Sequence, residues 1–240
     1  MKRAILIATA MVFSLAAAAF ATHPPVVLWQ DSFEAYAIGT PLPNCPTWIG
    51  DLVAYTIQDG GGGNHVVQTA MAAWNTQYAW TNFNMGMDPY DVQWLHFKAR
   101  STEVATDTRF RDSVAATTNS GNEVARWQFN ASQYKSRISW LGESGPAVNY
   151  NNGQWHDFDL IWNRTVGTFE YKVDGVLYRS LAAGETRAIH NVELWGQTWY
   201  GGPGWQYDDF AVGTIPEPSS LLALSAFGVG ALGFIRRRRV

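Results

Sequence analysis

The chain has 240 residues, with 17 Lys or Arg against 20 Asp or Glu, so its formal net charge is −3. Six of the basic residues lie in the two terminal segments, Lys2 and Arg3 in the first and Arg236–Arg239 in the last. Without them 11 basic side chains face 20 acidic ones, a net charge of −9. A body this acidic argues against nucleic acid and anionic lipid surfaces as partners, because both need a basic surface.

The N-terminal segment has the parts of a secretory signal peptide. Lys2 and Arg3 precede the apolar run Ala4–Phe20, and Ala19-Phe20-Ala21 is an A-x-A cleavage site. We expect signal peptidase to cut after Ala21, which makes residues 1–21 the signal peptide. Residues 22–214 then form one exported domain, long enough to bury a sizeable core.

Cysteine usage limits how this domain is stabilised. Cys45, in the loop Pro43–Pro46, is the only cysteine, so no intrachain disulfide is possible. Stability must come from packing, with a metal ion as a second source. We predict that Cys45 is an unpaired structural thiol; a bridge to another molecule is the alternative.

Short strands separated by Gly, Asn and Asp turns fill the first half of the body. The predicted strands are Val26–Glu34, a short piece around Trp48, Tyr55–Ile57, His65–Thr69, Val92–Ala99, Arg109–Val114, Val124–Asn130 and Ser136–Trp140. In Val92–Ala99, alternation places Leu95 and Phe97 on one face and Trp94 and His96 on the other. Met71–Thr81 fits either a short helix or a loop and strand.

The second half has the clearest pattern. After the turn-rich Gly142–Gly153, Phe158, Leu160 and Trp162 alternate with Asp157 and Asp159. A second alternating strand, Phe169–Val173, is followed by Asp174-Gly175, the signature of a tight hairpin. The remaining features are a strand Val192–Trp195, a Gly-rich aromatic loop Gly196–Gly204 and a last strand Tyr207–Val212. No long amphipathic helix is predicted in the body, so the sequence indicates an all-β sandwich.

Two stretches carry a family resemblance. Gly153–Leu160, which begins G-Q-W-H, and Gly167–Gly175, which ends Y-K-V-D-G, resemble a hairpin of LamG-like and pentraxin-like members of the concanavalin A-like superfamily. Asp31–Glu34 and Tyr207–Phe210 are similar to the first and last strands of such domains. The resemblance implies a two-sheet antiparallel jelly-roll sandwich whose concave face often binds carbohydrate, and often a structural calcium. Since this fold hosts enzymes, lectins and passive modules, it does not decide function.

Catalysis finds little support in the sequence. Glycosidases on this fold carry paired carboxylates in an E-x-D-x-x-E pattern, which is absent here. Asp157 and Asp159 point the same way but lie opposite apolar side chains, which places them on the solvated face. Glu185 and Glu193 have no partner carboxylate at suitable spacing. We therefore predict no catalytic residue.

Candidate binding residues form two groups. For calcium they are the acidic residues of the first and last strands, which usually lie side by side in such sandwiches: Asp31, Glu34, Asp208 and Asp209. The alternative is that these carboxylates satisfy strand-end amides. For carbohydrate they are aromatic and hydrogen-bonding side chains: Trp94 with His96, Arg126 with Gln128, and Trp195, Trp199 and Trp205. The alternative is that these tryptophans close the ends of the core.

Residues 215–240 form a separate tail. Pro216, Glu217 and Pro218 are followed by the uncharged apolar run Leu221–Ile235 and by Arg236, Arg237, Arg238 and Arg239. This order resembles the PEP-CTERM sorting signal of Gram-negative bacteria, in which an exosortase recognises the Pro-Glu-Pro motif. As a transmembrane helix the run would be about 22 Å long, short for a hydrocarbon core of about 30 Å. An ordinary single-pass anchor is the alternative.

These observations favour an exported protein that is anchored transiently in the inner membrane and then sorted to the envelope, outer surface or extracellular matrix. Its sandwich would bind polysaccharide without catalysis. A glycoside-active enzyme of the same superfamily and a purely structural envelope protein are the alternatives. The implied partners are signal peptidase, exosortase and a polysaccharide, and calcium is the one cofactor considered.

Overall fold

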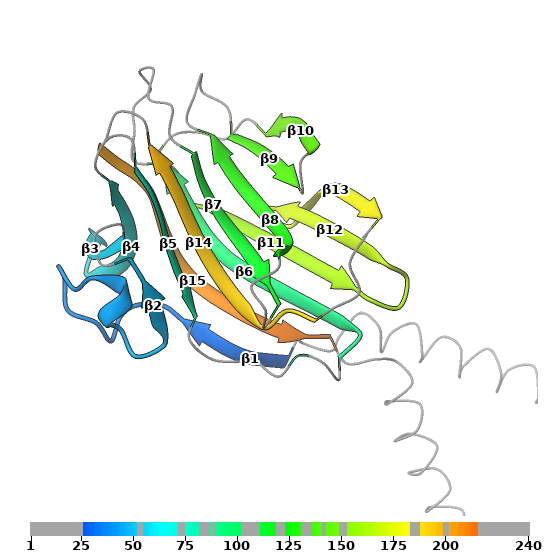
Figure 1. Cartoon of the computed structure of the whole chain (residues 1–240), viewed down its shortest axis with the longest axis horizontal. Coiled ribbons are helices and arrows are strands. Elements are labelled where there is room, and N and C mark those ends of the chain that lie inside the picture. Colours follow the sequence, from blue (N-terminus) through cyan, green and yellow to red (C-terminus); the bar gives the residue numbers. More distant parts are fainter. Residues whose placement is uncertain are drawn as a thin grey trace, which may run out of the picture. The chain divides into compact units, whose positions relative to one another are not determined.

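The body of the chain is built almost entirely of β-strands (Figure 1). The computed structural model describes residues 26–51, 55–71, 75–81, 87, 90–101, 111–118, 123–130, 136–140, 143–148, 153–182, 188–198 and 202–215. Within these ranges no helix is both long enough and apolar enough to cross a membrane. The predicted signal peptide and the sorting tail from Pro216 onward lie outside them.

Fifteen strands and one short 3₁₀ helix, η1 (Leu42–Asn44), make up the described elements. The strands are β1 (Val26–Asp31), β2 (Trp48–Gly50), β3 (Tyr55–Gly61), β4 (Asn64–Met71), β5 (Asn75–Thr81), β6 (Val92–Ser101), β7 (Arg111–Thr117), β8 (Glu123–Asn130), β9 (Ser136–Trp140), β10 (Glu143–Val148), β11 (His156–Asn163), β12 (Thr168–Val173), β13 (Val176–Ala182), β14 (Asn191–Thr198) and β15 (Gly202–Thr214).

The strands form two stacked sheets (Figure 1). The first has eight strands in the order β13-β12-β11-β6-β15-β4-β3, with β1 paired to β15. The second has five strands in the order β2-β5-β14-β7-β8. The hairpin of β9 and β10 is separate. Neighbouring strands such as β11 and β6, or β14 and β7, pair antiparallel. The first and last strands lie side by side, as the family resemblance implied.

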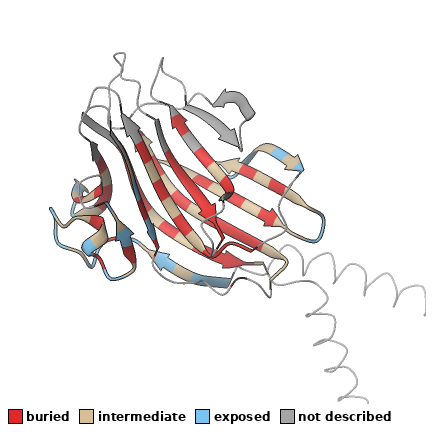
Figure 2. Ribbon diagram, in the orientation of Figure 1, coloured by how far each residue is buried: buried red, intermediate tan, exposed pale blue. Residues whose placement is uncertain are grey.

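Aromatic side chains fill the space between the sheets. Phe97 on β6 stacks on Phe158 of β11, with ring centroids 5.4 Å apart. From the opposite sheet, Trp127 on β8 meets Phe158 at 5.2 Å and Tyr171 at 4.8 Å, both edge to face. Such pairs contribute roughly 0.5–1.5 kcal/mol each beyond the area they bury. The core therefore stabilises the fold without a disulfide, and Figure 2 shows buried residues along the central strands of both sheets.

The predicted alternations are confirmed where they were clearest. Leu95, Phe97 and Ala99 are buried between the sheets, and so are Phe158, Leu160 and Trp162. Asp174 and Gly175 join β12 to β13 with φ of 50° and 74°. Positive φ at both central residues is the requirement of a type I′ turn, which explains the Asp-Gly pair.

Two predictions differ from the structure, and one open alternative is decided by it. Met71–Thr81 follows the loop-and-strand alternative: β4 ends at Met71, and Asn75–Thr81 is strand β5. The turn-rich Gly142–Gly153 contains β10, in which Glu143 pairs with Trp140 of β9. The predicted loop Gly196–Gly204 is mostly strand, since β14 runs to Thr198 and β15 begins at Gly202. Glycine content suggested loops where the chain instead continues its ladders.

The absence of a side chain at Gly50 allows β2 and β5 to approach closely. Its φ is 140°, and an added Cβ would clash with the carbonyl oxygen of Tyr78 and lie 2.7 Å from Cα of Ala79. Only a residue without Cβ fits this contact. The contact of Gly50 with Tyr78 and Ala79 holds β2 close to β5, the strand that carries both residues.

We predict that Gly50→Ala lowers the free energy of unfolding by about 3 kcal/mol, from backbone strain plus overpacking. Gly39→Ala is the matched control: Gly39 has a φ of 86° but open space around its Cα. It should lose only about 1 kcal/mol, from strain alone. Urea unfolding of both variants measures the difference, and equal losses would contradict the proposed clash.

Candidate functional site

The predicted carbohydrate-binding residues fall on opposite sides of the sandwich. Trp94 and His96 lie on β6, on the outer face of the eight-stranded sheet. Arg126 lies on β8 and Trp195 on β14, both in the five-stranded sheet. The predicted set therefore cannot form one site.

The other three residues of that set have different outcomes. Trp205 is buried in the core, with its ring 4.6 Å from that of Phe129, so it closes the sandwich rather than binding a ligand. Trp199 lies outside the described residues. Gln128 is on β8, directly opposite Ser113 in the register.

On the five-stranded sheet, the strand register brings separate parts of the sequence into rows. Glu193 on β14 is opposite Trp80 of β5 on one side and Ala115 of β7 on the other. Ala115 is in turn opposite Arg126 of β8. Trp80, Glu193 and Arg126 therefore share one row on the outer face, because directly opposite residues point to the same side of a sheet.

The neighbouring row carries two aromatic side chains. Trp195 is opposite Tyr78 of β5 and Ser113 of β7. The rings of Tyr78 and Trp195 lie 6.5 Å apart, and the guanidinium carbon of Arg126 lies 5.3 Å from the Trp195 ring centroid. The cation–π contact orients Arg126 across the sheet.

We call Tyr78, Trp80, Arg126, Glu193 and Trp195 the aromatic face. Tyr78 is 39% exposed and Trp80 is 38% exposed, high values for large aromatic side chains on a sheet. The small Ser113 and Ala115 between them are fully buried, so the larger side chains form the surface. The face thus presents aromatic rings beside one cation and one carboxylate.

The position of Tyr78 is fixed at the sheet edge by Asp51. The backbone N–H of Asp51 donates to the Tyr78 carbonyl at 2.8 Å, and the Tyr78 N–H donates to Asp51 Oδ2 at 2.9 Å. Together with the close approach of Gly50, these bonds hold this part of β5 against β2. The aromatic face is therefore built on regular strands, which position side chains more accurately than loops.

Sequence reasoning missed Tyr78 and Trp80. They lie in Met71–Thr81, whose pattern fits either a short helix or a loop and strand, although Tyr78 and Trp80 alternate there with Ala79 and Thr81. In the structure Ala79 and Thr81 are buried while the two aromatics are exposed. The period of two was the available signal.

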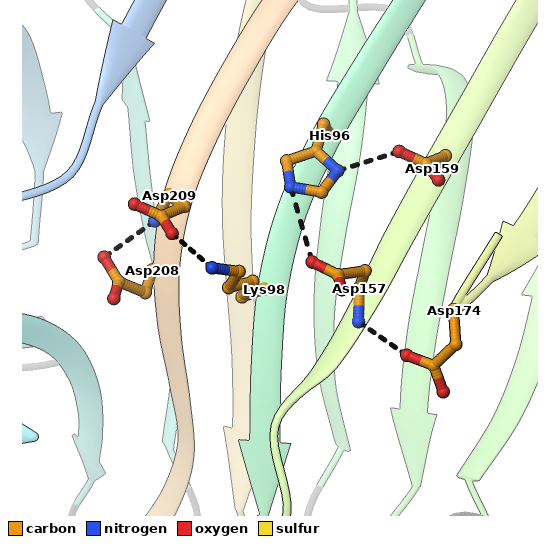
Figure 3. Close-up of polar contacts among 7 residues, drawn as sticks. All are labelled: His96, Lys98, Asp157, Asp159, Asp174, Asp208 and Asp209. Carbon is orange, nitrogen blue, oxygen red and sulfur yellow. Dashed lines mark hydrogen bonds and ion pairs between the residues drawn. The ribbon is translucent and has the colours of Figure 1, made fainter.

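The outer face of the eight-stranded sheet has a different character (Figure 3). His96 Nδ1 lies 2.8 Å from Asp159 Oδ1, and His96 Nε2 lies 3.7 Å from Asp157 Oδ1. Lys98 Nζ donates to Asp209 Oδ2 at 2.7 Å, and this hydrogen bond raises the pKa of Lys98. On this partly exposed face, carboxylates lie next to a histidine and a lysine, as expected for the polar side of Asp157 and Asp159.

Trp94 does not add an exposed aromatic to this face. It is buried although it points outward, and its cross-strand neighbour is Ile161. The predicted pair of Trp94 and His96 therefore offers no stacking surface.

The candidate calcium ligands are mostly engaged by protein donors. Asp31 accepts hydrogen bonds from the Phe33 N–H at 3.0 Å, the Tyr36 hydroxyl at 2.9 Å, Thr47 at 3.2 Å and the Trp48 indole at 3.0 Å. Burial, with a contribution from the charge of Asp31, raises the pKa of Tyr36 to about 12, so its hydroxyl remains a donor. Asp31 thus ties β1 to the loop before β2.

The other three candidates are engaged as well. Glu34 accepts from the His65 N–H at 3.0 Å, and Asp209 pairs with Lys98. Buried Asp208 accepts from the Asn64 side chain at 2.8 Å, and burial nevertheless raises its pKa. Among the described residues, no three His, Cys, Asp or Glu side chains are grouped to hold a metal ion. This geometry gives the predicted four-residue calcium site no support.

Cys45 is buried, and burial raises the pKa of its thiol to about 11. The thiolate is the reactive form, so this cysteine is inert at neutral pH. Its environment fits the structural role that was predicted.

Comparison with known proteins gives two findings. Residues 214–239 match the PEP-CTERM protein-sorting motif. The PEP-CTERM motif covers only the tail, and comparison with the sequences of curated proteins gave no match.

The second finding is the likeness of the body of the chain to solved structures. An endo-1,3-beta-glucanase from Streptomyces sioyaensis superposes with a TM-score of 0.62 at 14% identity, covering 81% of this chain and 99% of that one. The carbohydrate recognition domain of Emp46p gives 0.58 at 6% identity, covering 80% and 100%. The chain also spans 18% of a sialidase, with a TM-score of 0.59 at 8% identity. These neighbours show the fold alone, an all-β sandwich of two antiparallel sheets.

The contact between His156 and Asp174 yields a pH prediction. His156 Nδ1 lies 2.7 Å from Asp174 Oδ2, and the Asp157 N–H donates to Asp174 Oδ1 at 3.0 Å. Burial acts to raise the pKa of Asp174, but these two hydrogen bonds outweigh it and the pKa lies below its ordinary value. A carboxyl with a lowered pKa stabilises the fold above its unfolded-state pKa of about 4, and this contribution disappears as the pH falls through the folded-state value.

We therefore predict that Asp174→Asn lowers stability at pH 7 by less than about 1 kcal/mol, since the Asp174 side chain is half exposed, and that the loss shrinks as the pH falls below about 4. Asn tolerates the positive φ and still accepts from Asp157, so the turn is kept. Denaturant unfolding of both proteins between pH 3 and pH 7 measures the difference. A loss independent of pH would show that the charge of Asp174 does not contribute.

Proposed function

We propose that this is an exported protein, sorted by an exosortase through its PEP-CTERM tail, whose β-sandwich binds carbohydrate without catalysis. The tail would anchor the chain in the inner membrane until processing delivers the body to the envelope, the outer surface or the extracellular matrix. The aromatic face would be the binding surface. The observation that carries the binding proposal is the pair of exposed rings, Tyr78 and Trp80, beside Trp195.

The chemistry of the aromatic face suits a sugar. Pyranose rings present apolar C–H faces that pack on aromatic rings, and their hydroxyl groups need hydrogen-bonding side chains beside those rings. Here Trp80 adjoins Glu193, and Trp195 adjoins Arg126. An acceptor, Glu193, thus lies beside Trp80, and a donor, Arg126, lies beside Trp195.

The negative net charge of the body favours neutral polysaccharides over anionic ones as ligands. The body, residues 22–214, has 11 basic and 19 acidic side chains and so a formal charge of −8, which would repel an anionic polysaccharide over most of its length. We therefore propose a neutral polysaccharide. Two of the fold neighbours, a glucanase and a carbohydrate recognition domain, are named for carbohydrate, which agrees with this class but is a property of those proteins.

The geometry around Glu193 favours binding over hydrolysis. Glycosidases need two carboxyl groups about 5–10 Å apart across the scissile bond. The cross-strand neighbours of Glu193 on this face are Trp80 and Ala115, and its neighbours along the strand are Asn191 and Trp195. Asp157 and Asp159 lie on the other sheet, paired with His96. A purely structural role would leave the exposure of Tyr78 and Trp80 without a purpose.

We predict that the protein binds neutral glycans on an array and that Trp80→Ala weakens binding about thirtyfold, which corresponds to roughly 2 kcal/mol for an aromatic anchor. Trp155→Ala is the matched control, because this tryptophan packs under Arg100 beside the other sheet. The array is run with and without calcium, and circular dichroism confirms folding. Equal affinity of Trp80→Ala and the native protein would refute the site; no binding to any glycan would refute the function.

A separate prediction concerns sorting. Replacing Pro216, Glu217 and Pro218 by alanine should leave the chain unprocessed in the inner membrane, since the tail would still anchor but would no longer be recognised. The control replaces the adjacent Ser219 and Ser220. Membrane fractionation and intact mass of the retained chain give the readout. Normal processing of the alanine variant would mean an ordinary anchor rather than an exosortase substrate.

A further inference from the structure

The first three residues of β1 form an uncovered apolar edge. Val26 is 44% exposed, Val27 is 47% exposed and Leu28 is 38% exposed. Successive side chains of a strand point to opposite faces, so this part of β1 is uncovered on both sides. Figure 2 shows the exposed stretch on β1. We call Val26, Val27 and Leu28 the β1 edge.

The β1 edge belongs to the strand that pairs with β15, the strand from which the tail departs (Figure 1). β15 ends at Thr214, which is buried and hydrogen-bonded, so the folded body extends to this residue. Only six residues, 215–220, separate Thr214 from the apolar run that starts at Leu221. Fully extended, they span about 20 Å. Any bilayer that holds the tail is therefore within about 20 Å of the end of β15.

The apolar run is shorter than the hydrocarbon core is thick, and this mismatch further reduces the distance between the bilayer and the end of β15. Leu221–Ile235 would span about 22 Å as a helix, against about 30 Å for a hydrocarbon core. A span that is too short draws its flanking residues towards the interface or thins the bilayer. On one flank are the four arginines, which can snorkel, and on the other is the short connection to β15. The mismatch therefore pulls the body towards the lipid.

From these observations we infer that the β1 edge docks on the bilayer surface while the tail holds the chain there. The inference rests on the proposed sorting of the tail and not on carbohydrate binding. Three partly exposed apolar side chains on an acidic body are too few to hold a free protein on a membrane. The short tether supplies the missing affinity, since it raises the local concentration of the bilayer to the millimolar range or above.

Docking would have a consequence for processing. Pro216 follows the last strand after a single residue, Ile215, so the body leaves the motif no flexible linker. With the β1 edge on the lipid, the Pro-Glu-Pro segment is held at the membrane surface, where a membrane-bound protease acts. Once the tail is cut, the tether is lost and the body leaves the membrane.

The test places an environment-sensitive fluorophore on the full chain in vesicles of phosphatidylcholine and phosphatidylethanolamine that contain a spin-labelled lipid quencher. One variant carries the label at Val27→Cys and the control carries it at Val176→Cys, which lies on the edge strand β13 and is 69% exposed. Cys45 is buried and stays unlabelled. A protease site inserted after Ile215 allows the body to be released from the same vesicles. Leu28→Cys repeats the measurement on the neighbouring residue.

We expect severalfold stronger quenching at positions 27 and 28 than at position 176, and a fall to the control level after release. Equal quenching at all positions would overturn the docking. Quenching at position 27 that survives release would overturn the role of the tether. If the chain does not float with vesicles, the anchoring role of the tail fails and the docking fails with it. Glycan binding, measured on the array, is unaffected by each of these results.

Discussion

The aromatic contacts between the two sheets are the constraint on which the rest of the structure depends. With no disulfide to fix the chain, Trp127 of β8 packs on Phe158 and Tyr171 of the other sheet. Side chains of a strand alternate between faces, so burying Trp127 and Phe129 leaves Arg126 outside. A slip of one residue would exchange these positions, at the cost of burying a guanidinium and exposing the two rings.

The same reasoning applies to each strand of the aromatic face. Burial of Val192 and Leu194 turns Glu193 and Trp195 outward, and burial of Ala79 and Thr81 turns Tyr78 and Trp80 outward. The residues of the candidate site therefore point outward because their neighbours along each strand are buried in the core. Its residues are positioned by packing energy that is independent of any ligand, which gives a binding surface that needs little rearrangement.

This dependence also explains which parts of the site the sequence could predict. Alternation is local, so the inward and outward residues of β6, β8 and β11 could be read directly from the sequence. Strand order is not local: β14 lies between β5 and β7, and only this pairing places Trp80, Glu193 and Arg126 in one row. Without it, Arg126 and His96 looked like members of one face, although their strands belong to different sheets.

Backbone irregularities were a second limit. Tyr207 and Phe210 are both in the core although they are three residues apart, because Asp209 has a φ of 49° and interrupts the alternation of β15. A strict period of two would place one of them outside. The carboxylates near this irregularity and at the end of β1 suggested a calcium site. In the structure Asp31 and Asp208 accept hydrogen bonds from protein donors. Composition alone could not distinguish carboxylates with this role from carboxylates that bind a metal ion.

At the end of β15, the residues that build the fold give way to the residues of the sorting motif. β15 ends at Thr214, two residues before Pro216, and a proline has no backbone N–H with which to donate a further ladder hydrogen bond. The buried residues that precede it, Tyr207, Phe210 and Val212, complete the core before the motif begins. A cut within or beyond the Pro-Glu-Pro segment therefore removes no ladder hydrogen bond and no core side chain. The residues that build the core and the sheets therefore all precede the sorting motif.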